Sequence, residues 1–245
     1  MRHIIPFLAC GLMMLQAVPA PAEDGEPLKV CILSGCDTYD SETSLPPFQE
    51  YLQKNYNVSC TRVVRKAAGD LPGLEQLDDC DVALVFIKRM QLEGEQLRRF
   101  KKYATSGRPI VAVRTASHAV QTWLDFDREV LGGNYQGHHP VGPVTTIEVA
   151  AGADEHPILN GVELTTANDS LYKNQGHADD IHVLLRGGIP GQPSEALAWT
   201  RDYNGSRVFY TSLGAQETFE ETAFRRMLAN ALFWTAGRDV QTRKP

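Results

Sequence analysis

Two short, uniformly apolar runs constrain the fold of this chain more than any other feature. They occupy residues 81–86, where Val-Ala-Leu-Val-Phe follows an aspartate, and residues 109–113, where Ile-Val-Ala-Val follows a proline. Short runs without polar alternation are typical of strands in a parallel sheet that is covered on both faces. Between them, apolar residues at 97, 100 and 104 have helical spacing, and Gly107 predicts the helix end. The strand–helix–strand order predicts an α/β protein.

Other apolar patterns extend this organisation along the chain. We expect strands at residues 28–33, 58–64, 145–149, 196–200 and 207–211, with the last two forming a terminal pair. Pro46-Pro47 is expected to open a helix, and the apolar stripe from Phe224 to Leu232 is expected to pack in the core as the closing helix. The pattern predicts a single domain with an open parallel sheet and helices on both faces. In such a sheet, ligands bind beyond the carboxyl ends of the strands.

The first residues have the composition of a secretory signal peptide. A short basic start precedes a mostly apolar run over 4–18, and Ala20-Pro21-Ala22 provides a cleavage site. The run is too short for a stable membrane span, and a lipoprotein interpretation through Cys10 is weaker, since few apolar residues precede that cysteine. We therefore expect an exported protein, periplasmic or secreted, without an integral span. The expected divisions are a signal peptide at 1–22, a lead at 23–26, a domain at 27–238 and a tail at 239–245.

Charge and cysteine content narrow the class of protein further. The formal net charge of the 245-residue chain is −6, and no clustered basic face is apparent, which argues against nucleic acid as a partner. Four cysteines follow the leader, and in an oxidising compartment they allow three disulfide connectivities; buried free thiols are an equally good interpretation. They are Cys31, Cys36, Cys60 and Cys80. The sequence leaves the oligomeric state open.

The densest polar cluster, residues 114–118, directly follows the second apolar strand. α/β enzymes often hold a nucleophile at such a strand-to-helix turn, but this chain has no cysteine there. Arg114 either pairs with a carboxylate or contacts a ligand, and Thr115 and Ser117 either cap a helix or contact a ligand. Ser117 and His118 are not expected to form a catalytic pair, because adjacent helical residues point in different directions.

A glycine-rich segment, residues 131–139, ends in two histidines. His138 is a candidate acid/base or a ligand for a divalent metal such as Zn²⁺, while His139 and Tyr135 are candidate substrate contacts. Two histidines do not complete a metal site, so His177, Asp179 or Asp180 would have to join them through the fold; otherwise the segment is an ordered surface loop. Further candidate substrate contacts are Tyr172, Asn174 and Ser212. We expect His156 to be structural.

Four blocks together resemble the ThuA-like family, named for trehalose utilisation. They are 107–118, 131–138, 156–161, and 207–214 with the closing Phe-Trp helix. The resemblance implies a sheet like that of class I glutamine amidotransferases and a link to sugar metabolism. Relatives often carry a histidine where Arg114 ends the strand and another where this chain has Ala215. The resemblance therefore implies that any activity here depends on His138 or His118.

Three functional hypotheses follow. The leading one is an exported protein without glutaminase activity that acts on a sugar or an oxidised sugar derivative. In it, His138 and His118 serve in proton transfer, Arg114 anchors an oxygen-rich group, and Tyr135 and Tyr172 offer faces for stacking. The alternative is a non-catalytic carbohydrate-binding or scaffold protein that retains the fold. A third, a serine or threonine hydrolase, requires Thr115 or Ser117 within reach of a distant histidine.

Overall fold

The computed structural model describes residues 25–243, so the expected leader lies outside the described residues. The strands are β1 (Leu28–Gly35), β2 (Val58–Val64), β3 (Val82–Ile87), β4 (Ile110–Val113), β5 (Thr145–Val149), β6 (Thr166–Ala167), β7 (His182–Gly188), β8 (Glu195–Tyr203) and β9 (Ser206–Thr211). The α-helices are α1 (Ser41–Asn55), α2 (Gly94–Thr105), α3 (Gln216–Glu220) and α4 (Thr222–Thr235). Shorter helical turns are η1 (Leu74–Asp78), η2 (Arg114–His118), η3 (Phe126–Leu131) and η4 (Pro157–Leu159).

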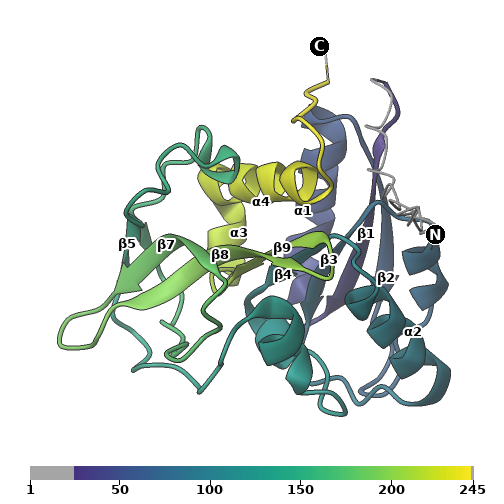
Figure 1. The fold of residues 1–245 in the computed structure, drawn as a ribbon, viewed down its shortest axis with the longest axis horizontal. Helices are drawn as coiled ribbons and strands as arrows, with labels where there is room; N and C mark the ends of the chain where they lie inside the picture. Colours follow the sequence, from purple (N-terminus) through teal and green to yellow (C-terminus); the bar gives the residue numbers. More distant parts are fainter. Residues whose placement is uncertain (1–24, 244–245) are drawn as a thin grey trace, which may run out of the picture.

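All of the strands join one nine-stranded sheet with the order β2-β1-β3-β4-β9-β8-β7-β5-β6. The first five in this order run parallel, and every pairing from β9 to β6 is antiparallel. We call these the parallel half and the antiparallel extension (Figure 1). The α/β class is confirmed, with a mixed sheet of four parallel and four antiparallel pairings among the described residues. The antiparallel extension is the part of the sheet that the purely parallel prediction lacked.

Helices cover both faces of the sheet. Apolar residues of α1, α3 and α4 pack with one face, and those of α2, η1 and η3 pack with the other. Every residue of β3 and β4 is buried, as their uniformly apolar composition predicts. In Figure 1, α1, α3 and α4 lie above the sheet, and α2 lies on the opposite side.

Helix α1 begins at Ser41, five residues before Pro46, so the expectation that the proline pair opens this helix is wrong. Asp40 is the N-cap: its carboxylate accepts hydrogen bonds from the backbone nitrogen of Thr43 at 3.3 Å and from its hydroxyl at 2.6 Å. Pro46 and Pro47 remove two backbone donors close to the helix start. The carbonyls that lose a partner belong to exposed residues of the first turn and can be solvated.

The strands expected at 196–200 and 207–211 pair with each other as β8 and β9, but they are not terminal in the sheet. β9 lies between β4 and β8, at the junction of the parallel half and the antiparallel extension. Residues 241–243, expected to be tail, form backbone hydrogen bonds at the start of β2: Asn57 N donates to Gln241 O at 2.8 Å and Arg243 N donates to Asn55 O at 2.9 Å.

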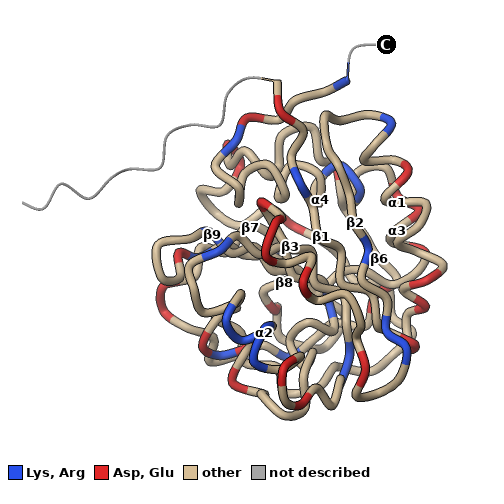
Figure 2. Tube along the Cα trace, turned by 90° about the vertical axis from the view of Figure 1, so that its right-hand side faces the viewer, with Lys and Arg blue, Asp and Glu red and all other residues tan. Residues whose placement is uncertain are grey.

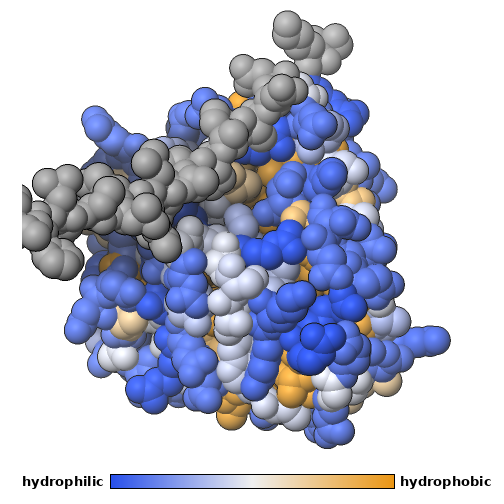
Figure 3. Space-filling model, turned by 45° about the vertical axis from the view of Figure 1, so that its right-hand side comes forward, coloured by the Kyte–Doolittle hydropathy of each residue, from blue (hydrophilic) through white to orange (hydrophobic). Residues whose placement is uncertain are grey.

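Acidic and basic residues are interspersed along the Cα trace in Figure 2, consistent with the modest net charge. The face in Figure 3 is mostly hydrophilic, with small separated apolar spots. Within residues 25–243, no helix combines the length and apolar composition that crossing a bilayer requires.

Candidate functional site

The candidate site is at the carboxyl edge of the parallel half, where Arg114 directly follows β4. Arg114 has a φ of 47°, the left-handed conformation that favours glycine, so the chain turns sharply here. Its carbonyl accepts hydrogen bonds from the Tyr210 hydroxyl at 2.9 Å and the Ser117 hydroxyl at 3.2 Å. This is the turn at which the sequence suggested a nucleophile, and the fold uses it to bury an arginine.

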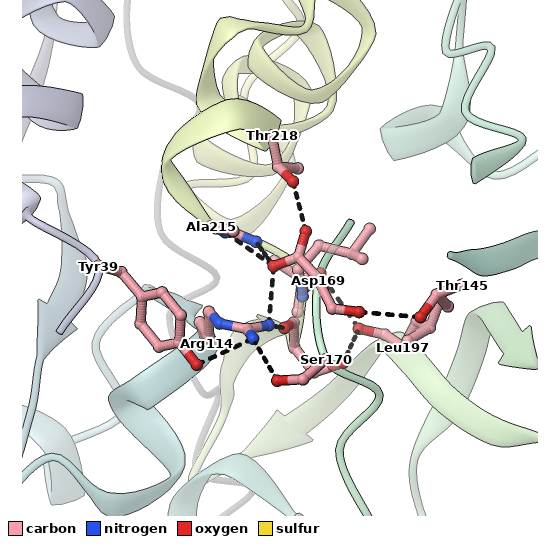
Figure 4. A network of polar contacts seen from close by, with 12 residues as sticks. Tyr39, Arg114, Thr145, Asp169, Ser170, Leu197, Ala215 and Thr218 are labelled. Carbon is pink, nitrogen blue, oxygen red and sulfur yellow. Dashed lines mark hydrogen bonds and ion pairs between the residues drawn. The ribbon is translucent and has the colours of Figure 1, made fainter. Parts of the chain in front are cut away.

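The Arg114 side chain is 1% exposed, and both of its Nη atoms contact oxygens (Figure 4), whereas its buried Nε has no hydrogen-bond partner. Nη1 lies 2.7 Å from Asp169 Oδ1 and also donates to the Ser212 carbonyl. Nη2 donates to the Tyr39 hydroxyl at 3.0 Å and the Ser170 hydroxyl at 2.9 Å. Burial opposes the charge, but Asp169 and then the nearby tyrosines favour it, so the pKa of Arg114 is raised. The pairing with a carboxylate that the sequence allowed is present.

Asp169, which sequence reasoning missed, is the counter-ion and is 2% exposed. Its Oδ1 also accepts hydrogen bonds from the backbone nitrogens of Gly214 at 3.0 Å and Ala215 at 2.7 Å, just before α3, and its Oδ2 accepts from the Thr218 hydroxyl. Four donors thus satisfy this carboxylate. Asp169 connects the loop before β7 to the turn after β9 and to Arg114.

The hydrogen bonds of Arg114 determine the donor and acceptor roles of two hydroxyl groups. An arginine can only donate, so the Tyr39 and Ser170 oxygens are acceptors in these bonds. Each hydroxyl keeps its own proton for another partner. Both residues line a cavity of about 350 Å³ at this edge of the sheet. The two hydroxyls are therefore available as hydrogen-bond donors to an oxygen-bearing ligand, although Arg114 itself has no accessible donor left.

His138 lines the same cavity and is exposed. Its Nδ1 lies 2.8 Å from the carbonyl oxygen of His139. Because a carbonyl only accepts, Nδ1 must carry the proton, and Nε2 of the neutral ring has a free lone pair. His138 can therefore accept a proton from a bound molecule. Other lining groups include Thr38, Asn168 and Gln216, which are polar and uncharged, and the carboxylates of Asp40 and Glu217.

His118, Tyr135 and Tyr172 form an aromatic group behind Arg114. The His118 ring stacks on Tyr135 at a centroid distance of 4.4 Å, and Tyr172 lies against both rings. The Arg114 guanidinium lies 4.6 Å from the centre of the Tyr172 ring, which places this group directly beside the buried ion pair. Burial, followed by the positive charges of neighbouring side chains, lowers the pKa of His118 to about 3. His118 is therefore neutral near pH 7.

Ser117 and His118 are in contact, although their side chains were expected to point in different directions. Ser117 Oγ lies 3.0 Å from His118 Nδ1, because both belong to the tight turn η2 and not to a regular α-helix. The Ser117 proton goes to the Arg114 carbonyl, so Nδ1 of His118 is the donor in this contact. Ser117 is buried, and this arrangement makes it a group that fixes the tautomer of His118.

Asp127 supports this aromatic group from η3, a π-helical turn. Its Oδ2 accepts a hydrogen bond from the backbone nitrogen of Tyr135 at 2.8 Å, while Oδ1 has no hydrogen-bond partner. Gly133 is required beside it, because a β-carbon there would overlap Oδ1. Burial raises the pKa of Asp127 to about 7.

The remaining predicted site residues lie apart from the cavity lining. His139 is buried, with its two ring nitrogens 3.0 Å from Glu195 Oε1 and 2.9 Å from Gln192 Oε1. Asn174 is buried, and its backbone nitrogen donates to Glu195 at 3.1 Å. Three further residues contact backbone carbonyls: Thr115 donates to Ile87 O, Ser212 to Leu197 O, and His177 Nδ1 to Ala178 O.

Two other expectations concern metal ions and His156. Among the described residues, no group of three or more His, Cys, Asp or Glu side chains could hold a metal ion. His156 accepts a hydrogen bond from the backbone nitrogen of Ile158 at 3.2 Å at the start of η4, and its ring lies 4.9 Å from that of Trp234. This is the structural role that we expected for His156.

Comparison with known proteins identifies relatives of this fold. The family model for ThuA, described as trehalose utilisation, matches residues 29–235. A ThuA-like protein from Parabacteroides merdae ATCC 43184 is 19% identical, with a TM-score of 0.70 over 90% of this chain and 93% of that one. A second, from Bacteroides uniformis ATCC 8492, is 18% identical, with a TM-score of 0.65 over 89% and 95%.

A more distant structure, described as a GMP synthase subunit from Thermoplasma acidophilum, is 14% identical. Its TM-score is 0.55, and the alignment covers 86% of this chain and 96% of that one. At this level of identity the likeness concerns the fold, which is therefore shared with ThuA-like and amidotransferase-like proteins. No curated protein matches the sequence.

Proposed function

The chain belongs to the ThuA family, and on this premise we propose that it binds a sugar or an oxidised sugar derivative in the carboxyl-edge cavity and transfers a proton through His138. The observation that carries the proposal is the pairing of one free imidazole nitrogen with two outward hydroxyl donors. A sugar carries hydroxyl protons and oxygen acceptors close together, so it complements this arrangement. General acid–base catalysis requires a positioned group of this kind.

The roles of the surrounding residues differ from those suggested by sequence. Arg114 acts indirectly, because its Nη donors are all engaged and it orients the Tyr39 and Ser170 hydroxyls towards a ligand oxygen. Among the described residues that line the cavity, His138 is the one histidine, and Ala215 contributes only a methyl group where relatives often have another. His138 is therefore the proposed acid/base, and His118 a neutral group that supports Tyr135.

Two histidines provide a matched experiment for this role. In both His138 and His177, Nδ1 contacts the carbonyl of the following residue, but only His138 lines the cavity. The protein is screened by thermal shift against neutral sugars, sugar acids and keto sugars, and turnover is assayed with each ligand that binds. We expect His138→Gln to lower turnover about 100-fold or more with little change in the ligand-induced shift. His177→Gln is expected to keep wild-type turnover.

Full turnover in His138→Gln would overturn the assignment of the acid/base. The alternative is a non-catalytic sugar-binding protein, which Ala215 favours because it leaves the cavity with one imidazole. A sugar-dependent thermal shift without any turnover in the wild-type protein would support that alternative. No shift with any member of the panel would contradict both.

We also propose that the protein acts outside the cytoplasm. The support is the basic start, apolar run and cleavage site within residues 1–22. Expression of the full chain with amino-terminal sequencing of the exported product tests this. A mature protein that begins at Glu23 is expected, and recovery of the uncleaved chain in the cytoplasm would contradict it.

A further inference from the structure

The wall of the carboxyl-edge cavity carries an uneven charge. Its charged side chains are Arg114 and the carboxylates of Asp40 and Glu217. Arg114 is buried, and its Nη donors are engaged by oxygens of the chain, whereas Asp40 and Glu217 are exposed. Within residues 25–243, neither of these two carboxylates forms an ion pair with a lysine, arginine or histidine. The cavity therefore offers a ligand two negative charges and no accessible arginine.

The starts of α1 and α3 also lie at this cavity, and the start of a helix ordinarily attracts an anion. At α1 this position is filled by Asp40, whose carboxylate accepts a hydrogen bond from the backbone nitrogen of Thr43 at 3.3 Å. At α3 it is filled by Asp169, which accepts hydrogen bonds from the backbone nitrogens of Gly214 and Ala215. The chain thus pairs both helix starts with carboxylates of its own, and a ligand anion gains nothing from them.

One lysine approaches this edge of the sheet from outside the cavity. Lys88 follows β3, and its ammonium group donates to the Thr38 hydroxyl at 2.5 Å. Thr38 lines the cavity, but Lys88 does not. Lys88 is therefore the cation that would have to offset Asp40 and Glu217 if the site accepted an anionic ligand, and the experiment below has an outcome for that case.

We infer, on the basis of the proposed function, that the cavity selects uncharged and positively charged sugars and excludes sugar acids, with Asp40 and Glu217 as the residues that determine this specificity. A carboxylate only accepts hydrogen bonds, so it complements the hydroxyl or ammonium groups of such a ligand. The Tyr39 and Ser170 hydroxyls donate to the ligand oxygens. An ionised carboxyl group on the ligand would instead face two like charges. Among oxidised sugars, this selectivity favours keto sugars over sugar acids.

Two matched sets of sugars test this selectivity by titration calorimetry near pH 7. They are glucose with glucuronate and glucosamine, and galactose with galacturonate and galactosamine. At about 6 Å in a medium like water, two like charges together lower an affinity roughly tenfold. We therefore expect each uronate to bind at least about tenfold more weakly than its neutral parent, and each amino sugar to bind more tightly than the parent. About 0.5 M sodium chloride should reduce both differences, because Asp40 and Glu217 are exposed.

Two double variants with the same net charge assign the selectivity to residues. Asp40→Asn with Glu217→Gln removes both carboxylates from the cavity wall, and asparagine caps a helix as well as aspartate does. In this variant we expect each uronate to bind within about threefold of its parent, while the unchanged affinity for the parent shows that the site is intact. Glu50→Gln with Glu220→Gln is the control. It neutralises two exposed carboxylates in α1 and α3 that do not line the cavity, and it is expected to keep the wild-type preference.

The outcomes separate this inference from the proposed function. Equal affinity of the wild-type protein for a uronate and its parent, or a preference that persists in the Asp40→Asn and Glu217→Gln variant, would overturn the inference and leave the proposed function intact. Tighter binding of the uronates would also overturn it and would indicate that Lys88 sets the charge preference of the site. No binding of any of the six sugars would contradict the inference together with the proposed function.

Discussion

The parallel half and the antiparallel extension are stabilised in different ways. In the parallel half, β3 and β4 are buried along their whole length between two layers of helices. In the extension, β5 alternates between buried and exposed residues, and Val149 is 45% exposed. The central strands β3 and β4 of the parallel half thus form a core of continuous apolar residues, whereas the outer strand β5 of the extension has one face exposed to solvent.

The candidate site lies where these two parts meet. The parallel half contributes Tyr39 after β1 and Arg114 after β4, and loops associated with the extension contribute His138, Asp169 and Ser170. The parallel half thus holds the buried cation, and the extension supplies its counter-ion and the imidazole. Function at this site therefore depends on the extension being docked on the parallel half.

Asp169→Asn is the change expected to break this docking most severely. It leaves the Arg114 charge buried without its counter-ion, which should lower the free energy of unfolding by about 3–5 kcal/mol. Urea unfolding measures the loss. Glu95→Gln removes the carboxylate that pairs with Arg98 and Arg99 at the exposed start of α2 and serves as the control, with a loss below about 1 kcal/mol expected. Equal effects in the two variants would contradict the role of the Asp169 pair.

A valine-to-alanine substitution in each half should measure the difference in packing between the two halves. Val85 in β3 is 1% exposed, and Val85→Ala should cost roughly 2–3 kcal/mol by leaving a cavity. Val149→Ala in β5 removes the same atoms from a half-exposed position and should change stability by less than about 0.5 kcal/mol. The comparison of urea midpoints tests this, and similar losses in both variants would show that the two halves are packed alike.

Asp127→Asn tests the segment that connects β4 to the extension. The pKa of Asp127 is raised to about 7 in the folded chain, against about 4 when exposed. As pH rises through this window, the unfolded carboxyl ionises first, so wild-type stability falls relative to the variant. We expect a relative loss of up to about 4 kcal/mol, about 1.4 kcal/mol for each of three pKa units, which levels off above about pH 8.

His118 contributes to the pH dependence of stability with the opposite sign, because its pKa is lowered to about 3. The unfolded histidine gains a proton as pH falls through its ordinary range, so folding is disfavoured at low pH. This contribution is present in both proteins and cancels in the difference between wild type and Asp127→Asn. A difference that does not vary with pH would contradict the raised pKa of Asp127.

The same division explains what the sequence could predict. β3 and β4 were evident because burial on both faces requires continuous apolar residues. β7 was missed because it ends in Gly187-Gly188 and follows two aspartates, a composition that resembles a loop. The purely parallel sheet was therefore an incomplete description of the fold.

Site residues, like the strands, could be predicted only where the local sequence pattern was distinctive. Arg114 and His138 stood out in dense polar motifs beside predicted elements, and both are at the cavity. Asp169 and Tyr39 lie in ordinary polar loops, and their partner is distant in the sequence. In the sequence, an aspartate that is buried and accepts four hydrogen bonds cannot be distinguished from an aspartate on the surface. Only the tertiary arrangement distinguishes them.

The position of β9 has a consequence for the order in which the chain matures. β9 follows all the other described strands along the chain, yet it lies between β4 and β8 within the sheet. During synthesis, both of these neighbours have an unpaired edge until residues 206–211 have been added. Such edges favour association with other chains. This topology therefore requires that the unfinished chain be kept from associating with other protein chains until β9 has been made.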